Sequence, residues 1–309
     1  MPQNRFFHWL ASLLVIVCAV SVAAAQPAKT TLTVAAYNIE NLFDVFDDPY
    51  TPDEGTRVKP RKELEQAATL IKKLDADLIA FEEVENEGVI RAFVKEFLPD
   101  AGYKHVAAAA SNDGRGIRTA VASRLPIRSI TSYRFLELTL PGEDTTWRFA
   151  RDLMHVQIEV GKDKVLHAFV VHLKSKRGEK ENPDGAKWRL AEAVKARQII
   201  DDISVRDGAW TLIMGDFNDT PDSPPMKALT DRTGAKPAAG LHDVHASIPA
   251  DKRITYLPQR YRGTIDYILV NPALHERLVK DSAQTISDES LLGGSDHAPI
   301  VAKFDVSEK

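Results

Sequence analysis

Short runs of β-branched and aromatic residues, each bounded by polar or turn-forming residues, recur along the chain and predict eight strands. These strands are expected at residues 31–39, 77–84, 118–124, 153–160, 165–173, 211–216, 263–270 and 298–306. Apolar residues at helical spacing predict helices at 60–74, 87–98 and 187–203. A short fourth helix is expected to start near Ser223, which can cap it ahead of Pro224 and Pro225.

The order of these elements indicates the fold class. Strands and helices do not alternate strictly, as they would in a parallel doubly wound sheet. The pattern favours two packed sheets with helices on the outer faces, an α/β or α+β sandwich. The sequence has no repeat and no long low-complexity linker, so a single domain is expected.

The first 25 residues are typical of a secretory signal peptide. One cation, Arg5, precedes an apolar stretch at 9–22, and three alanines at 23–25 precede Gln26. The apolar stretch is shorter than the roughly 20 residues that a membrane span needs. An uncleaved N-terminal anchor is the alternative. Cleavage before Gln26 leaves a domain at 26–309, exported to the periplasm or the medium, and removes Cys18, the only cysteine.

The charge balance limits the choice of substrate. The chain has 40 cations and 44 acids, and removing Arg5 leaves 39 − 44, a net charge of −5. Proteins that bind nucleic acid usually carry a basic face. Either the substrate is small, or the cations gather locally. Residues 172–178, which include Lys174 and Lys176, are the best candidate for such gathering, unless they form an ordinary solvated loop.

Polar residues stand at the ends of several predicted strands. In the sequence 215–218 (GDFN), Asp216 and Asn218 share one face if the chain stays extended. They would then present a carboxylate and an amide to one phosphate or water. The alternative is an Asx-turn that closes the strand.

His297 follows Asp296 near the start of the last predicted strand, and Asp266 interrupts an apolar strand. Adjacent strand residues face opposite sides, so Asp296 is not expected to pair with His297. A carboxylate inside an apolar strand is costly unless it is paired, which makes Asp266 the expected partner of His297. A structural aspartate bonded to backbone amides is the alternative.

Glu83 is a candidate metal ligand at the end of the strand 77–84. Glu82 and Glu83 are adjacent, so one should point into the cleft and the other outward. Asn38, which ends the first strand, could orient Glu83 or a water. Hard divalent ions such as Mg²⁺ prefer oxygen ligands and keep several waters. A surface salt bridge of Glu83 is equally consistent with the sequence.

Together these motifs resemble those of the endonuclease/exonuclease/phosphatase superfamily, in particular its deoxyribonuclease I-like members. The resemblance extends over residues 31–306 and is carried by motifs in the family's order: 37–43 (YNIENLF), 81–86 (FEEVEN), 170–175 (VVHLKS), 215–225 (GDFNDTPDSPP) and 293–300 (GGSDHAPI). It implies a four-layer sandwich in which two mostly antiparallel sheets pack face to face, with helices outside.

The resemblance also implies roles for individual residues. Glu83 matches the metal-ligating glutamate, and Glu82 replaces the family's glutamine. Asn38 matches the amide beside the metal, and Asp296 an acid that positions metal or water. Five further residues match positions that act on the phosphate, the attacking water or the leaving group: His172, Asp216, Asn218, Asp266 and His297.

An exported metal-dependent phosphodiesterase is therefore expected, most simply an endonuclease that uses Mg²⁺ or Mn²⁺, with Ca²⁺ as a further option. Arg118, Lys174 and Lys176 are candidate substrate-binding cations, although Arg118 could instead form an ion pair. Lipid or inositol phosphates are alternative substrates, and a non-catalytic binding module is the alternative function. Neither stable membrane insertion nor an obligate protein partner is expected.

Overall fold

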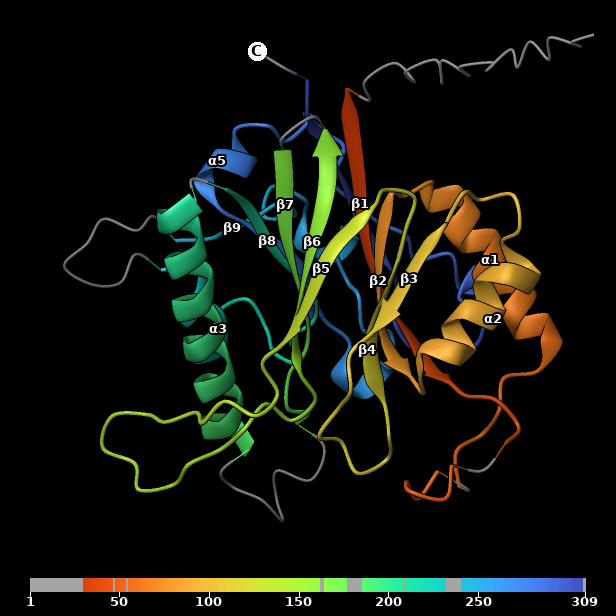
Figure 1. Cartoon of the computed structure of the whole chain (residues 1–309), viewed down its shortest axis with the longest axis horizontal. Coiled ribbons are helices and arrows are strands. Elements are labelled where there is room, and N and C mark those ends of the chain that lie inside the picture. The colour runs from red at the N-terminus through yellow and green to blue at the C-terminus, as the bar shows by residue number, and fades with distance from the viewer. Residues whose placement is uncertain are drawn as a thin grey trace, which may run out of the picture.

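The computed structural model describes residues 30–46, 48–53, 55–161, 164–176, 185–207, 209–231 and 240–307. The predicted signal peptide, residues 1–25, lies outside this part of the chain. Two mixed six-stranded sheets form the centre (Figure 1). The first has the order β11 (Gln284–Thr285), β12 (Ile300–Asp305), β1 (Thr31–Leu42), β2 (Leu78–Val84), β4 (Arg118–Ser123), β3 (His105–Ala108). The second has the order β5 (Ile127–Ser132), β6 (Leu153–Gly161), β7 (Lys164–His172), β8 (Trp210–Asp216), β10 (Asp266–Val270), β9 (His242–Asp243).

Helices cover the outer faces of both sheets, which gives the expected four layers (Figure 1). The helices α1 (Arg61–Leu74) and α2 (Glu87–Phe97) cover the first sheet, and α3 (Gly185–Asp207) and α4 (Pro224–Thr230) cover the second. Short elements complete the described chain: α5 (Pro272–His275), η1 (Ala250–Lys252), η2 (Gln259–Tyr261) and η3 (Glu289–Leu291). Among the described residues, no helix combines the length and the apolar character needed to cross a bilayer.

The predicted strands and helices are all present, with small shifts at their ends. Pro60 is the N-cap of α1 and not its first residue, whereas Ser223 caps α4 as predicted by accepting a hydrogen bond from Met226 N at 3.5 Å. The strands β3, β5, β9 and β11 were not predicted. The longest of these, β5, is largely exposed and polar, so it lacks the apolar alternation that marks a buried strand.

The side chains that face the space between the two sheets are apolar along most of each strand and polar at one end. In β1, Val34 and Ala36 point into the core between the sheets, and the next residue on that face is Asn38. In β2, the same face runs through Leu78 and Ala80 to Glu82. The facing strands of the second sheet likewise end in polar residues on this face: His172 in β7, Asp216 in β8 and Asp266 in β10. The polar residues therefore converge at one end of the space between the two sheets.

Candidate active site

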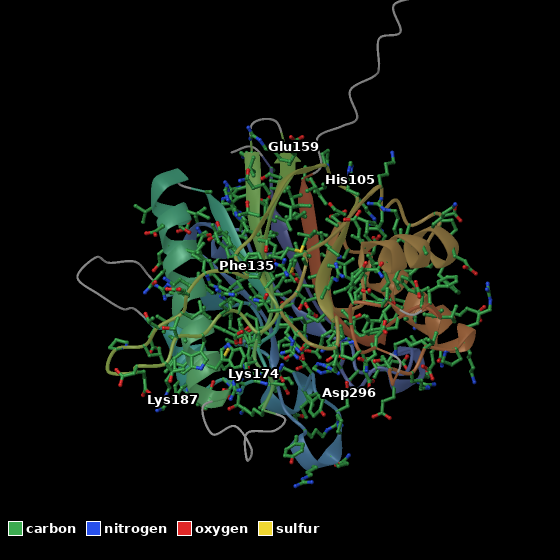
Figure 2. All side chains as sticks on the ribbon, turned by 60° about the horizontal axis from the view of Figure 1, so that its bottom comes forward. His105, Phe135, Glu159, Lys174, Lys187 and Asp296 are labelled. Atoms are coloured by element: carbon green, nitrogen blue, oxygen red, sulfur yellow. The ribbon has the colours of Figure 1, made fainter. Side chains whose placement is uncertain are left out.

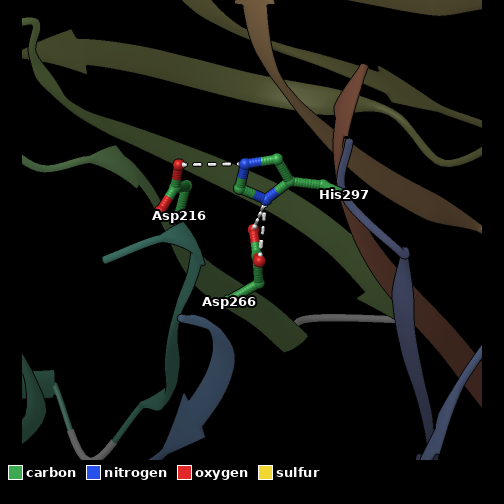
Figure 3. A group of neighbouring side chains, drawn as sticks. All are labelled: Asp216, Asp266 and His297. Atoms are coloured by element: carbon green, nitrogen blue, oxygen red, sulfur yellow. Dashed lines mark hydrogen bonds and ion pairs between the residues drawn. The ribbon is translucent and has the colours of Figure 1, made fainter. Parts of the chain in front are cut away.

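The centre of the site is a hydrogen-bonded pair formed by Asp266 and His297, beside Asp216 (Figure 3). Nδ1 of His297 lies 2.9 Å from Oδ2 and 3.2 Å from Oδ1 of Asp266. Nε2, on the other side of the ring, lies 3.8 Å from Oδ2 of Asp216. All three side chains are buried. The structure thus brings together the carboxylate and the imidazole that the sequence paired.

A turn ahead of β12 holds His297 in place. The His297 backbone N–H donates to Ser295 Oγ at 3.0 Å, and that hydroxyl donates to the carbonyl oxygen of Asn38 at 2.7 Å. The ring of Tyr256 packs edge-on against the imidazole, with 5.1 Å between ring centroids. These contacts come from β1 and from the loop ahead of β10, so the position of His297 depends on both sheets.

The carboxylates around His297 favour its charged form. Burial alone would lower its pKa, but the negative charges of Asp266, Asp216 and Asp296 outweigh burial and raise the pKa well above the usual value. The ring is therefore an imidazolium at neutral pH. Because Asp266 occupies Nδ1, the Nε2–H is the bond that can point toward a ligand.

Asp216 is held by two amides. Its Oδ2 accepts hydrogen bonds from Nδ2 of Asn38 at 3.2 Å and from Nδ2 of Asn218 at 3.3 Å. Its Oδ1 accepts from the Asn218 backbone N–H at 2.8 Å, which is the Asx-turn considered from the sequence. β8 ends at Asp216 and Asn218 has φ 53°, so the turn, and not a continued strand, brings these two side chains together. Burial, followed by the negative charge of Asp266, raises the pKa of Asp216 to about 7.

His172 also lies beside Asp216. Its Nε2 lies 3.4 Å from Oδ2 of Asp216, and its buried Nδ1 has no hydrogen-bond partner among the described residues. Burial and the positive charges of Arg151, His297 and Arg115 lower its pKa well below the usual value. His172 is therefore neutral. A neutral imidazole is a poor proton donor, so His172 does not suit the predicted role of protonating the leaving group.

Both glutamates of β2 face the site, although only one was expected to do so. Glu82 lies on the inner face of β2 and is completely buried, and neither carboxylate oxygen has a hydrogen-bond partner among the described residues. Glu83 has a left-handed backbone (φ 61°), which breaks the strand alternation. The negative charge of Glu83 consequently contributes to the raised pKa of Asp216.

An acid cluster, formed by Glu40, Glu83 and Asp296, lies next to His297. The Asp296 backbone N–H donates to Oε2 of Glu40 at 3.1 Å. Burial, then the negative charges of Asp296 and Glu83, raise the pKa of Glu40. Oδ1 of Asp296 also lies 3.7 Å from Nε2 of His297, so the expectation that these neighbours do not pair is wrong. Asp296 lies in a bend after the turn at 293–294, ahead of β12, so strand alternation does not apply to it.

The side chains present fit a hard divalent cation. The negative charges of Asp296 and Glu83 act on Glu40, so a cation among these carboxylates would offset their repulsion, and oxygen ligands are what Mg²⁺ and Mn²⁺ prefer. Among the described residues, the group of three whose ligand atoms all lie within 4.8 Å of one another is Asp216, Asp266 and His297, so the carboxylates of Glu40, Glu83 and Asp296 are more widely spaced. Asp266 and His297 already hydrogen-bond to each other, and the wider spacing of the acid cluster suits an ion that keeps several of its waters.

Several site residues were missed by sequence reasoning. Glu82 could have been found, because it continues the inner face of β2, whereas Glu40 has a left-handed backbone (φ 53°) at which strand alternation no longer holds. Arg151 could not have been found by periodicity. It is buried, its Nε lies 3.0 Å from Oδ2 of Asp113, and its Nη1 donates to the carbonyl oxygen of Leu173 beside the site.

The predicted substrate-binding cations differ in their surroundings. Lys176 forms an ion pair with Asp219 at 2.6 Å, and the Nζ of Lys174 lies 5.4 Å from the centre of the Trp188 ring. Arg118 lies at the site end of β4, opposite Val84. Arg124, at the other end of β4, pairs with Asp75. The ion pair offsets part of the charge of Lys176, and residues 177 and 178 lie outside the described part of the chain, so the gathering of cations at 172–178 stays a prediction.

Comparison with known proteins identifies the family. The model of the Endonuclease/Exonuclease/phosphatase family matches residues 33–301, which include every site residue described above. The chain belongs to this family. It is therefore a hydrolase of phosphoester bonds, in a family whose enzymes depend on a metal ion. No curated protein matches the sequence at a significant level.

Solved structures of the family share the fold at low sequence identity. The human Nocturnin catalytic domain with bound sulfate is 18% identical, with a TM-score of 0.62 over 90% of this chain and 95% of that one. ANGEL2, a 2′,3′-cyclic phosphatase in complex with adenosine-2′,3′-vanadate, is 17% identical, with a TM-score of 0.62 over 89% and 95%. An AP endonuclease from Archaeoglobus fulgidus is 19% identical, with a TM-score of 0.59 over 89% and 100%.

Proposed function

We propose that this protein is an exported metal-dependent phosphodiesterase that cleaves nucleic acid by in-line attack of water. The observation that supports this most strongly is a cationic imidazole held beside a carboxylate that titrates near neutral pH. The pKa of His297 is raised well above its usual value, and the Asp216 carboxylate, with a pKa of about 7, lies 3.8 Å from its Nε2. A stable cation beside a base that titrates near neutral pH suits the hydrolysis of a phosphate ester.

The roles of the residues follow from their contacts. Asp216, oriented by Asn38 and Asn218, takes a proton from the attacking water. The resulting hydroxide adds to phosphorus opposite the leaving oxygen, and that P–O bond breaks. His297 donates its Nε2–H to a phosphate oxygen, whose charge grows in the transition state. The departing alkoxide accepts a hydrogen bond from neutral His172 and takes its proton from solvent. No covalent intermediate with the protein is needed.

The acid cluster would hold the divalent cation, which we propose is Mg²⁺ or Mn²⁺, with Ca²⁺ as a further option. When bound, the ion supplies positive charge that neutralises the phosphate and favours its approach to Asp216. Glu83 and Asp296 are the ligands proposed from the sequence, and Glu40 joins them on the basis of its hydrogen bond with Asp296. Asn38 lies beside them, because its Oδ1 accepts from the Glu40 backbone N–H at 3.0 Å.

Hydrolysis of bis(p-nitrophenyl) phosphate, a generic diester, tests the activity. Turnover is expected with Mg²⁺ or Mn²⁺ and not with EDTA. Replacing His297 with alanine should lower kcat by about 10²- to 10⁴-fold. A matched control is His105→Ala on β3, because His105 lies at the opposite end of the sheets (Figure 2). Equal activity of His297→Ala and the wild type, with both variants folded, would refute the proposed site.

A substrate panel tests the nucleic-acid assignment. Single-stranded DNA, duplex DNA, RNA, sphingomyelin and phosphoinositides are compared under the same metal conditions. Cleavage of the lipids alone would replace nucleic acid with the lipid-phosphate alternative and leave the site intact. Export is tested separately, by expressing the full chain and sequencing the N-terminus of the protein recovered outside the cytoplasm. The expected first residue is Gln26.

A further inference from the structure

Exposed aromatic side chains gather at the end of the sheets that carries the site. Among the described residues four aromatic side chains are exposed, Phe46, Tyr50, Phe135 and Tyr261, which we call the aromatic rim. Each belongs to a loop that leaves or enters a strand at its site end: the loop after β1, the connection from β5 to β6, and the loop ahead of β10. All four aromatic rings thus lie on loops at the site end of the two sheets.

Phe135 is the best defined member of the aromatic rim. Its side chain is 63% exposed. The guanidinium carbon of Arg134 lies 4.2 Å from the ring centre, and that of Arg148 lies 6.0 Å from it. Tyr261 has a similar neighbour, since the Arg260 guanidinium lies 5.1 Å from its ring centre. An exposed ring next to guanidinium groups combines a stacking surface with positive charge.

The segment that carries Phe135 is held in place. Nδ2 of Asn112 donates to the carbonyl oxygens of Arg134 at 2.7 Å and Phe149 at 2.9 Å. Nη1 of Arg134 donates to the carbonyl oxygen of Ser111 at 3.0 Å, and Nε1 of Trp188 donates to that of Arg148 at 2.6 Å. The exposed ring therefore sits on a pre-organised support, which limits the entropy lost when a ligand binds.

Guanidinium groups continue from this segment to the site. Asn112 N donates to the carbonyl oxygen of Arg151 at 3.1 Å, and Arg151 reaches Leu173, next to His172. Arg115 lies on the same side, with its Nε 3.6 Å from Oδ1 of Asp113 and its side chain 45% exposed. The positive charges of Arg151 and Arg115 both act on His172. Basic side chains thus connect the Phe135 ring with the His172 flank, although the whole chain is acidic.

We infer that Phe135, framed by Arg134 and Arg148, is a stacking platform for an unpaired base of single-stranded nucleic acid whose scissile phosphate lies at Asp216 and His297. This inference rests on the proposed function and specifies the form of its substrate. A base can stack on a protein ring only when that face is not covered by a neighbouring base, so the platform selects single strands or frayed ends over intact duplex. The local guanidinium groups attract the backbone without requiring a positive net charge.

The platform is tested with Phe135→Ala and a matched control, Val205→Ala, which removes another exposed apolar side chain on α3, remote from the site. Kinetics are measured with oligothymidylate, with a duplex of the same length and with bis(p-nitrophenyl) phosphate. Phe135→Ala should raise KM for oligothymidylate about 5- to 150-fold, as expected for the loss of one base stack. Its kcat/KM for the small diester should be unchanged, and Val205→Ala should match the wild type throughout.

Several results would overturn the platform and separate it from the proposed function. If the wild type cleaves oligothymidylate and Phe135→Ala does so equally well, the platform is wrong and the nuclease assignment stands. An equal loss on the polymer and the small diester would mean that Phe135 only supports the fold. If Phe135→Ala loses binding to anionic phospholipid vesicles but not to oligothymidylate, the aromatic rim binds membranes instead. Cleavage of the small diester without cleavage of any nucleic acid would refute both the platform and the nuclease assignment.

Discussion

Replacing Glu82 with glutamine should stabilise the protein at neutral pH and have little effect near pH 4.5. Glu82 is fully buried and its two oxygens have no hydrogen-bond partner among the described residues. Burial, then the negative charges of Asp266 and Asp216, raise its pKa well above the usual 4.5. A carboxyl group with a raised pKa stabilises the folded state fully below its unfolded pKa, and this contribution is lost as the pH rises through the folded pKa. Glutamine has the same shape and no charge to bury.

The magnitude follows from the width of that pH window. The free energy of unfolding falls by about 1.4 kcal/mol for each pH unit between the two pKa values of one group. From an unfolded pKa of 4.5 to pH 7.5 is three units, so the titration of Glu82 itself contributes at most about 4 kcal/mol to the gain of Glu82→Gln at pH 7.5. Screening by solvent does not reduce this value, because the side chain is completely inaccessible. Acids remote from Glu82 titrate alike in both proteins and cancel in the difference, whereas Asp216 and Asp266, whose charges act on Glu82, are also relieved of its charge in Glu82→Gln, which adds to the gain.

Urea unfolding of the wild type and Glu82→Gln at pH 5 and pH 7.5, with EDTA, measures the effect. Glu159→Gln, at the far end of β6, controls for the loss of one negative charge (Figure 2). The two proteins should differ by less than about 1 kcal/mol at pH 5, and Glu82→Gln should be clearly more stable at pH 7.5. A difference that does not change with pH, or a less stable variant at pH 7.5, would refute the reasoning. Activity should persist, since the family motif that residues 81–86 resemble has glutamine at this position.

Three further outcomes follow from the same geometry. Asp266→Asn should lower kcat about 10²-fold or more. It also lowers the pKa of His297, so the fall of kcat/KM at high pH should begin at a lower pH, and an unshifted pH profile would contradict the pairing. Gly215→Ala should destabilise the fold by about 1–3 kcal/mol in urea unfolding, because φ is 128° and an added Cβ would lie 2.2 Å from the Val171 carbonyl oxygen. Lys59→Met should lower Tm in EDTA yet increase the Tm gain from Mg²⁺, because it removes a buried cation whose charge acts on the acid cluster; a smaller gain would contradict this role.

The sequence was a good guide to the site where local pattern and position agree. Asp216 and Asp266 were identified because polar residues interrupt apolar strands, and alternation alone then places them on one face. The same rule failed at Glu83 and Asp296. Both lie where the backbone leaves the extended conformation, one at a left-handed residue and one in a bend, and adjacent residues no longer point in opposite directions there. Strand alternation therefore predicts side-chain direction only as far as the strand continues.

The sequence by itself determined the strands, the helices, the family motifs and most of the polar residues of the site, because these depend on short-range periodicity and on residue type. The tertiary structure alone decided which charges act together. The hydrogen bond of His297 to Asp266 joins residues 31 positions apart, and the one from Asn38 to Asp216 spans 178 positions. Contacts between distant segments likewise decide that His172 is neutral, that Glu82 is buried and that guanidinium groups lie beside Phe135. Burial and neighbouring charge set a pKa, and both are fixed only when distant segments pack together.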